Sequence, residues 1–250
     1  MQLLKFSHFG EGVRQAHSLR LGGVSSGIYE SLNLGLDVGD SPDLVEENYR
    51  RFSEAIGFNL DALCVAHQEH TDVVLRVDEG AGVASPFSGI DGFVTDVVGV
   101  PLMVRFADCQ GLLYFDPVRR VIAAVHSGWR GNAKNIVGKA VQKMVAEYGC
   151  CAADILVGVS ASLGPCHAEF SHPREELPAF MHRYISEDGK HVNLWDCCFD
   201  ELVAEGVLDS NIEMFRRCTV CENDKFFSFR VAKQAGFEKS GHMGAVIELV

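Results

Sequence analysis

The chain has 250 residues, of which 47% are hydrophobic and 22% charged, and its formal net charge is −12. This composition excludes an intrinsically disordered protein, and the acidic balance argues against general binding of nucleic acid, which needs a basic face. No apolar run approaches the ~20 residues of a membrane-spanning helix, and the first residues do not resemble a signal peptide. We therefore expect a cytoplasmic protein that does not associate with membranes. The nine cysteines are odd in number and scattered, which favours reduced thiols over a disulfide framework.

The first half of the chain predicts one helix and a series of short strands. The first 40 residues are rich in Gly and Ser and predict ordered loops with short strands. Ser41 and Pro42 are residue types of a helix N-cap and first helical position, and apolar residues follow at helical spacing up to Ile56. Apolar runs then predict strands at residues 73–77, 92–95, 102–106, 112–115 and 121–125.

The second half predicts helices separated by fewer strands. The clearest helix begins near Asn132, because one apolar stripe continues to Tyr148 and Gly149 closes it. Residues 155–159 predict a strand, whereas two further helices are predicted at 175–185 and 195–203. The segments FFSFRVAK and GAVIELV predict closing strands. With no internal repeat and no linker, these elements predict one mixed α/β (α+β) domain over residues 1–250.

Polar side chains interrupt or end three of the apolar runs. Gln68 and His70 lie just ahead of a predicted strand, Asp108 and Cys109 separate two strands, and His126 ends a third strand before a Gly-rich turn. Side chains at strand ends commonly converge on a cleft. A buried carboxylate such as that of Asp108 costs several kcal/mol unless it is paired. These positions are therefore the first candidates for a functional site.

Three of these residues have the chemistry of a metal site. The imidazoles of His70 and His126 and the thiolate of Cys109 suit Zn²⁺ and leave a fourth position open, the form of a catalytic zinc site. The same ligand set also suits copper. A metal-free alternative is a nucleophile pair in which Cys109 is the thiolate and His126 its base. The residue types and spacing leave these alternatives open.

Other cysteines, histidines and arginines are further candidates. Cys218 and Cys221 have the spacing of a zinc knuckle or redox pair, but no second pair follows, so we interpret them as ordinary thiols. Cys166 and His167 fall on a predicted loop that either lines a pocket or makes a turn. A guanidinium binds phosphate through paired hydrogen bonds, although it also forms structural salt bridges. The arginines considered for these roles are Arg20, Arg105 and Arg130.

A series of motifs, taken in order, resembles the YfiH-like family, also called the laccase-domain or multicopper polyphenol oxidase family. These motifs are SLRLGGVSSGIYESLNLGLDVGD, HQEHTDVV, DGFVTD, ADC, HSGWRGN, LGPCHAEF and FFSFR. The resemblance runs from about residue 15 to the C terminus. It implies a layered α/β/β/α fold similar to the catalytic domain of cytotoxic necrotizing factor toxins.

The resemblance also implies an enzyme and its site. Members of the family are similar to purine nucleoside phosphorylases that cleave adenosine, inosine and methylthioadenosine with phosphate and also deaminate adenosine. The implied metal-binding and catalytic residues are His70, Cys109 and His126, with zinc expected and copper as the alternative. By motif position, the predicted substrate and phosphate contacts are Arg20, Asn33, Gln68, Asp108 and Arg130. The expected partners are a purine nucleoside and phosphate, and the chain is expected to be a monomer or homodimer.

The rival functions are a metal-free cysteine hydrolase, a copper-dependent polyphenol oxidase, and a metal-storage or scaffold protein. The chain also departs from the family pattern around the predicted ligands. Gly111 stands where the family has proline, beside the predicted ligand Cys109, and His242 stands where its closing motif has arginine. His67 is a competing ligand candidate because it precedes the Gln-x-His motif.

Overall fold

The computed structural model describes residues 1–84 and 86–250. Its strands form two sheets, one of four strands in the order β1-β2-β10-β5 and one of six in the order β3-β4-β7-β6-β8-β9. The strand bounds are β1 Leu3–Leu4, β2 Val13–Ser18, β3 Val74–Arg76, β4 Gly92–Thr95, β5 Leu102–Phe106, β6 Gln110–Asp116, β7 Val121–Ser127, β8 Leu156–Val159, β9 Ile212–Met214 and β10 Met243–Leu249. Most neighbours are antiparallel, but β3 pairs with β4, and β8 with β9, in parallel.

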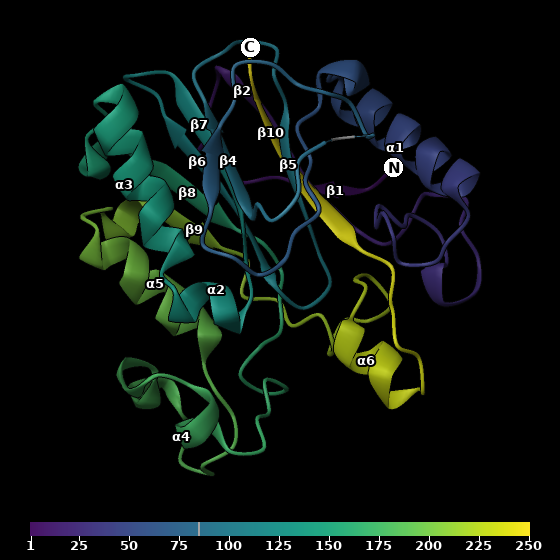
Figure 1. The fold of residues 1–250 in the computed structure, drawn as a ribbon, viewed down its shortest axis with the longest axis vertical. Helices are drawn as coiled ribbons and strands as arrows, with labels where there is room; N and C mark the ends of the chain where they lie inside the picture. The colour runs from purple at the N-terminus through teal and green to yellow at the C-terminus, as the bar shows by residue number, and fades with distance from the viewer. Residues whose placement is uncertain (85) are drawn as a thin grey trace.

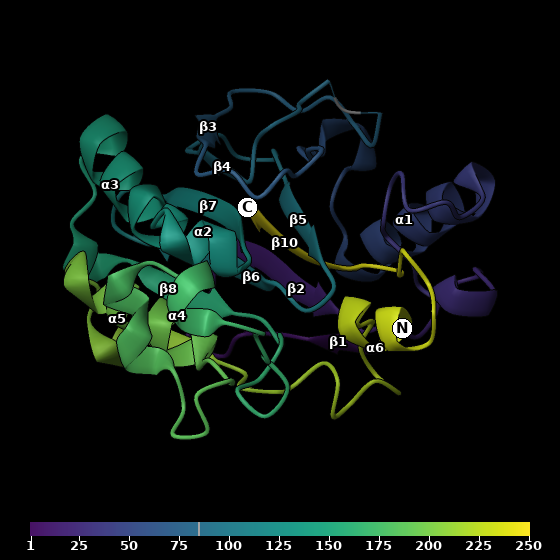
Figure 2. The same ribbon diagram turned by 60° about the horizontal axis from the view of Figure 1, so that its bottom comes forward.

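Helices cover the outer faces of both sheets. Their bounds are α1 Pro42–Ile56, α2 Trp129–Ala133, α3 Ile136–Tyr148, α4 Pro173–Glu176, α5 Leu194–Ala204 and α6 Phe229–Gln234. Figure 1 shows α3 and α5 on one side of the stacked sheets and α1 on the other, and Figure 2 shows the same order from a second direction. The expected α/β/β/α layering and mixed α/β class are therefore confirmed.

Alternation along the strands explains the layers. In β5, Val104 faces the core between the two sheets, whereas its neighbour Met103 packs with α1. In β6, Leu113 faces the core between the sheets, and Leu112 packs with α3. Successive side chains of a strand point to opposite faces, so strands buried on both faces appear as the continuous apolar runs seen in the sequence.

The polar break between β5 and β6 is the point where the chain passes from one sheet to the other. β5 is an edge strand of the four-stranded sheet, and β6 lies inside the six-stranded sheet. Ala107, Asp108 and Cys109 make the connection, and Asp108 has a positive φ of 83°. The crossing therefore places Asp108 and Cys109 at the ends of two stacked sheets.

The structure corrects several predicted elements. The long helix predicted from Asn132 is broken at Asn135, which has a φ of 54° and caps α3 through its side chain. The helix predicted at 175–185 is wrong, since α4 ends before Pro178 and a 3₁₀ turn follows at Ala179–Tyr184. The strand predicted from FFSFRVAK is also wrong: Ser228 caps the helix α6. The short strand β9 was not predicted.

The remaining predicted helices and strands coincide with observed elements to within three residues at each end. In the described parts of the chain, the helices are all too short or too polar to traverse a bilayer.

Candidate metal centre

Three connections bring the predicted ligands together. His70 lies in the loop before β3, Cys109 in the connection between β5 and β6, and His126 near the end of β7. One ligand atom from each lies within 4.8 Å of the other two. The Cys109 Sγ is 3.7 Å from the His70 Nε2, and the two imidazole rings meet edge to face with centroids 4.9 Å apart. Residues from three distant segments thus form one Cys/His cluster, which indicates a metal site.

Asp91 supports this cluster and was missed by the sequence reasoning. Its fully buried carboxylate accepts a hydrogen bond at 2.8 Å from the His126 Nδ1. It also accepts from the backbone N–H groups of His70, at 3.0 Å, and Thr71, at 2.7 Å. A carboxylate on one ring nitrogen fixes the tautomer and orientation of a metal-binding histidine, so Asp91 leaves the His126 Nε2 as the free nitrogen. The signal in the sequence was the carboxylate that opens DGFVTD directly before an apolar strand.

The charges of this cluster depend on one another. Burial by itself would raise the pKa of Asp91, but hydrogen bonds from His126 and Thr71 lower it to about 2. Burial would likewise raise the pKa of Cys109, whereas the adjacent His126 and His70 lower it to about 6. Burial opposes protonation of His126, but the Cys109 and Asp91 charges raise its pKa to about 9. The surroundings therefore favour the thiolate form of Cys109, which is the form that binds a metal or acts as a nucleophile.

Hydrogen bonds to the Asp108 carboxylate explain why a charged residue interrupts the two apolar runs. One carboxylate oxygen accepts from the Thr219 Oγ1 at 2.6 Å, and the other accepts from the Arg230 backbone N–H at 2.6 Å. Its own carbonyl accepts from the Leu163 N–H at 2.7 Å. Burial raises the pKa of Asp108, and these hydrogen bonds partly offset that rise. Asp108 therefore ties the Cys109 connection to the loops after β8 and β9.

Two glycines near Cys109 occupy positions where a side chain would collide with a neighbour. A Cβ at Gly128, between His126 and α2, would lie 2.7 Å from the Cys109 Sγ and 3.1 Å from the His70 Cδ2. A Cβ at Gly111 would lie 2.3 Å from the Phe106 ring, and the Gly111 N–H donates to the Ser160 Oγ at 2.8 Å. Proline has a side chain and lacks that N–H. In this chain, therefore, the neighbours Phe106 and Ser160 suit glycine at position 111 and not the family's proline.

Two of the predicted substrate contacts are engaged within the protein. The side chain of Gln68 pairs with the backbone of Arg105, donating at 2.7 Å and accepting at 2.8 Å. Asn33 is fully buried, and its amide bonds to Asp40, Gly35 and His242. Both side chains hold the protein's own backbone together, and their contact with a substrate stays a prediction.

The predicted arginines lie in different surroundings. The guanidinium of Arg20 donates to the Asn223 carbonyl at 2.8 Å, beside a cavity of about 430 Å³ that Glu30 and Asp224 also line. Those carboxylates weigh against phosphate binding there. Arg130 is exposed and stacks on Trp129, with its guanidinium carbon 4.3 Å from the ring centroid. It is therefore the freer of the two anion candidates, and it follows His126 closely in the chain.

The other nearby candidates do not join the cluster. His67 pairs with Asp37 at 2.7 Å on the surface, so it does not compete as a ligand in this structure. Arg105 is buried and donates to the Ala66 carbonyl at 2.5 Å. Burial and nearby positive charge lower the pKa of His242 to about 3. His242 is therefore neutral and does not replace the charge of the family's arginine.

Comparisons with known proteins bear on this arrangement. Residues 14–250 match the family described as multi-copper polyphenol oxidoreductase laccase. The chain is 34% identical over 226 residues to the purine nucleoside phosphorylase YlmD of Geobacillus stearothermophilus, covering 84% of this chain and 81% of that protein. It is 32% identical over 235 residues to the purine nucleoside phosphorylase YfiH of Escherichia coli strain K12, covering 90% and 91%.

Solved structures show the same fold. The crystal structure of the hypothetical protein YfiH from Bacillus licheniformis matches with a TM-score of 0.90 at 27% identity, covering 99% of this chain and 96% of that one. The crystal structure of YlmD from Geobacillus stearothermophilus matches with a TM-score of 0.87 at 32% identity, covering 96% and 92%. This chain therefore belongs to the multi-copper polyphenol oxidoreductase laccase family, together with the YfiH and YlmD proteins.

Proposed function

We propose that this protein is a zinc-dependent purine nucleoside phosphorylase whose site is built on His70, Cys109 and His126. The observation that carries the site is the convergence of these three ligand atoms within 4.8 Å. The reaction is suggested by the relatives, which are named purine nucleoside phosphorylases. Inosine, adenosine and methylthioadenosine are the proposed substrates, and adenosine deamination is the proposed second activity.

The residues fit a metal ion. Two neutral imidazoles and one thiolate are a common three-ligand set of catalytic zinc. Asp91 accepts from the His126 Nδ1 and so leaves Nε2 for the ion, and Gly128 keeps the space between Cys109 and His70 free of a side chain. Copper accepts the same ligands, so the identity of the ion needs a direct measurement. Bound there, zinc would supply Lewis acidity at neutral pH.

The chain's own residues position the site for this reaction. Asp91 binds both the His126 ring and the backbone around His70, so it holds two ligands in a fixed relation. The Lys134 Nζ donates to the His70 carbonyl at 3.0 Å and holds that loop against α2. Such partners keep ligands oriented without reorganisation during turnover.

In phosphorolysis, a phosphate oxygen forms a bond to the ribose anomeric carbon as the bond from that carbon to the purine nitrogen breaks. The bonding electrons leave with the purine, which takes up a proton. We assign Arg130 to the phosphate because its guanidinium is exposed and is held by stacking on Trp129. Arg20 is the second candidate.

A purine-release assay tests the proposal. Inosine and adenosine are incubated with phosphate, and free base is measured for the native protein, the chelated protein and the Cys109→Ala variant. We expect phosphate-dependent release that both treatments abolish and that zinc restores after chelation. The Cys151→Ala variant removes an exposed thiol that lies outside the cluster of His70, Cys109 and His126, and it should behave as the native protein. Undiminished turnover by Cys109→Ala would refute the assigned role of Cys109.

The metal-free cysteine hydrolase is the second candidate, because the Cys109 sulfur and a His126 ring nitrogen lie within 4.8 Å of each other and His126 lowers the pKa of Cys109. The His70→Ala variant separates the two functions. A zinc enzyme loses both its ion and its turnover in this variant, whereas a Cys109–His126 pair keeps its nucleophile and base. Activity that persists in zinc-free His70→Ala protein would favour the hydrolase.

A further inference from the structure

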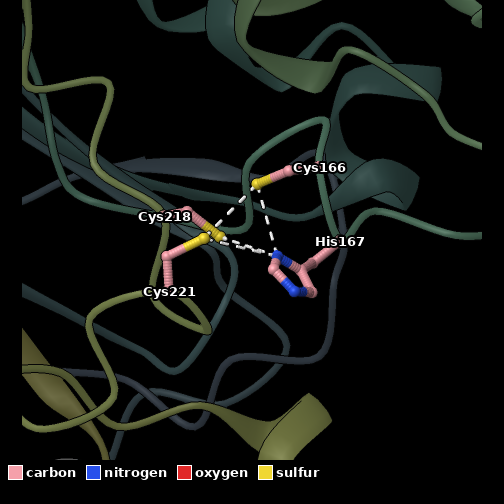
Figure 3. Close-up of side chains that lie close together, drawn as sticks. All are labelled: Cys166, His167, Cys218 and Cys221. Atoms are coloured by element: carbon pink, nitrogen blue, oxygen red, sulfur yellow. Dashed lines mark hydrogen bonds between the residues drawn. The ribbon is translucent and has the colours of Figure 1, made fainter.

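A second group of potential metal ligands lies in the loops that follow β8 and β9. Cys166 and His167 belong to the loop after β8, and Cys218 and Cys221 to the loop after β9. Because β8 and β9 are parallel neighbours, with Val159 opposite Met214, their loops leave the sheet at the same edge. A bridge between Ser162 and Cys218 continues the pairing beyond the strands. Figure 3 shows that the four side chains point toward one another.

The four ligand atoms all lie within 4.8 Å of one another, close enough to share one ion. The His167 Nδ1 lies 3.3 Å from the Cys166 Sγ, 3.5 Å from the Cys221 Sγ and 3.6 Å from the Cys218 Sγ. The sulfur atoms of Cys166 and Cys221 are 3.6 Å apart. A tetrahedral Zn²⁺ with Zn–S of about 2.3 Å and Zn–N of about 2.0–2.1 Å requires ligand separations of about 3.6 Å for N to S and about 3.8 Å for S to S. The observed separations agree with both values.

Neither a disulfide nor core packing accounts for this cluster. A disulfide needs sulfur atoms about 2.05 Å apart, whereas all nine cysteines are free and the Cys166 and Cys221 sulfur atoms are separated by 3.6 Å. Core packing does not explain Cys166 and Cys221 either, because both are exposed. The Gly164 N–H donates to the Cys218 Sγ at 3.4 Å. A backbone amide directed at a sulfur atom is a hydrogen-bonded environment suited to a thiolate ligand.

We propose that Cys166, His167, Cys218 and Cys221 bind a structural Zn²⁺ ion, separate from the cluster at His70. Three cysteines and one histidine fill all four positions of tetrahedral zinc, so this site is closed to substrate. The ion joins the loops after β8 and β9. Thr219, which lies between Cys218 and Cys221, donates to the Asp108 carboxylate. The second site therefore supports the residue that precedes Cys109.

Metal analysis of the full chain, purified under reducing conditions, tests this proposal. We expect about two zinc ions per chain in the native protein. Cys221→Ala should lose one equivalent, Cys109→Ala should lose the other, and Cys151→Ala should lose neither. If the zinc site at His70 does not exist, the native protein should hold one equivalent that Cys221→Ala loses and Cys109→Ala keeps. An unchanged zinc content in Cys221→Ala would overturn the second site.

A pair of variants at His167 distinguishes a ligand from a residue that only aids folding. His167→Cys creates a four-cysteine set, which is also a structural zinc site, and should retain the ion. His167→Ala should lose it. Loss of zinc from both variants in folded protein, or its retention in both, would contradict ligation by His167.

Cobalt substitution tests the number of sulfur ligands. With Co²⁺ in place of zinc, the sulfur-to-metal charge-transfer absorption of the closed site should be about three times that of the open site, because it has three thiolates rather than one. Cys109→Ala removes only the open site, so it should keep most of the total charge-transfer absorption. Cys221→Ala disrupts the closed site, so it should lose most of that absorption. Mass spectrometry of protein purified under reducing conditions, with its metal bound, provides a further check. A disulfide between Cys166 and Cys221 in that protein would overturn the metal assignment.

Discussion

The two Cys/His clusters lie at the same end of the six-stranded sheet but differ in the number of ligands that they offer. The cluster of His70, Cys109 and His126 offers three ligand atoms, and a fully buried carboxylate, Asp91, orients one of its histidines. The cluster of Cys166, His167, Cys218 and Cys221 offers four ligand atoms, carried by two neighbouring loops. A three-ligand zinc site leaves a position for substrate or water, whereas a four-ligand site does not. We therefore propose a chemical role for the first cluster and a role in loop stability for the second.

The largest expected effect is on turnover, and it distinguishes the clusters directly. Cys109→Ala should lower kcat/KM by roughly 10³-fold or more, equivalent to about 4 kcal/mol of transition-state stabilisation, because it removes a metal ligand. Cys221→Ala should lower kcat/KM far less, since it acts only through the loop that holds Asp108. Steady-state phosphorolysis of inosine measures both. Equal losses in the two variants would remove the distinction between a chemical and a structural cluster.

The second prediction concerns thermal stability. Here Cys221→Ala should have the larger effect, whereas Cys109→Ala has the larger effect on kcat/KM. Cys221→Ala should lower Tm more than Cys109→Ala, because a structural zinc contributes directly to folding free energy. For a chain of this size, each kcal/mol lost lowers Tm by roughly 2–4 °C. Thermal unfolding with and without a zinc chelator measures the effect. If chelation lowers the Tm of Cys221→Ala as much as that of the native protein, the stabilising ion lies elsewhere.

The third prediction concerns the support of the open cluster. Asp91→Asn should weaken zinc binding at His70, Cys109 and His126 by about 10–100-fold, the usual cost of removing a ligand's hydrogen-bond partner. Asp116→Asn is the matched control, because Asp116 is equally buried but caps the β6–β7 turn through the Val118 and Arg119 amides. Titration with zinc measures the affinity of both variants, and only Asp91→Asn should bind zinc more weakly than the native protein. Similar weakening in both would mean that the effect of Asp91 is general destabilisation.

The fourth prediction is a pH dependence of stability outside both clusters, without an expected effect on turnover. Glu201 of α5 accepts from Asn132 of α2 at 3.0 Å, and burial raises its pKa to about 7 despite hydrogen bonds from Asn132 and Cys197. A raised folded-state pKa means that the folded protein binds this proton more tightly than the unfolded chain. The stability linked to Glu201 is therefore fully present below about pH 4.5 and is lost as the pH rises towards and through about 7.

Glu201→Gln should remove this pH-dependent loss of stability. As the pH rises from 5 to 8, the free energy of unfolding of the variant should therefore increase by up to ~2–3 kcal/mol relative to that of the native protein. Denaturant unfolding at both pH values measures the difference. Because α5 also contacts the second cluster's loop, through the Trp195 Nε1 and the Ser162 Oγ at 2.8 Å, zinc content is measured in parallel. A constant zinc content would show that the helical layer titrates independently of the metal sites.

Local sequence patterns were informative where burial and capping act within one element. The apolar runs of β5, β6 and β7 and the apolar stripe of α3 all formed as predicted. The pattern failed where a backbone turn or a cap overrode it. Asn135 broke the predicted long helix by taking a positive φ, and Ser228 started a helix in a segment rich in phenylalanine.

The candidate site was only partly accessible from the sequence. Strand-end positions and ligand chemistry grouped His70, Cys109 and His126, the family resemblance implied the same three residues, and the structure places them together. Asp91 had only a weak signal, because a carboxylate before an apolar strand, as in DGFVTD, is also a common turn residue. The strand β9 is three half-buried residues long, too short to produce a pattern that places Cys218 and Cys221 beside Cys166.

The sequence by itself determined the chemical types at each position: thiols and imidazoles at loops and strand ends, and apolar runs long enough for buried strands. Only the tertiary structure decided which of them meet. The passage of the chain from β5 to β6 carries Cys109 to the ends of both sheets, and the parallel pairing of β8 with β9 joins two loops 51 residues apart in the chain, from His167 to Cys218. Side-chain chemistry is local to a residue, whereas sheet order depends on contacts distant in sequence. For that reason Cys218 and Cys221, interpreted from spacing as ordinary thiols, become candidates for a metal site in the folded chain.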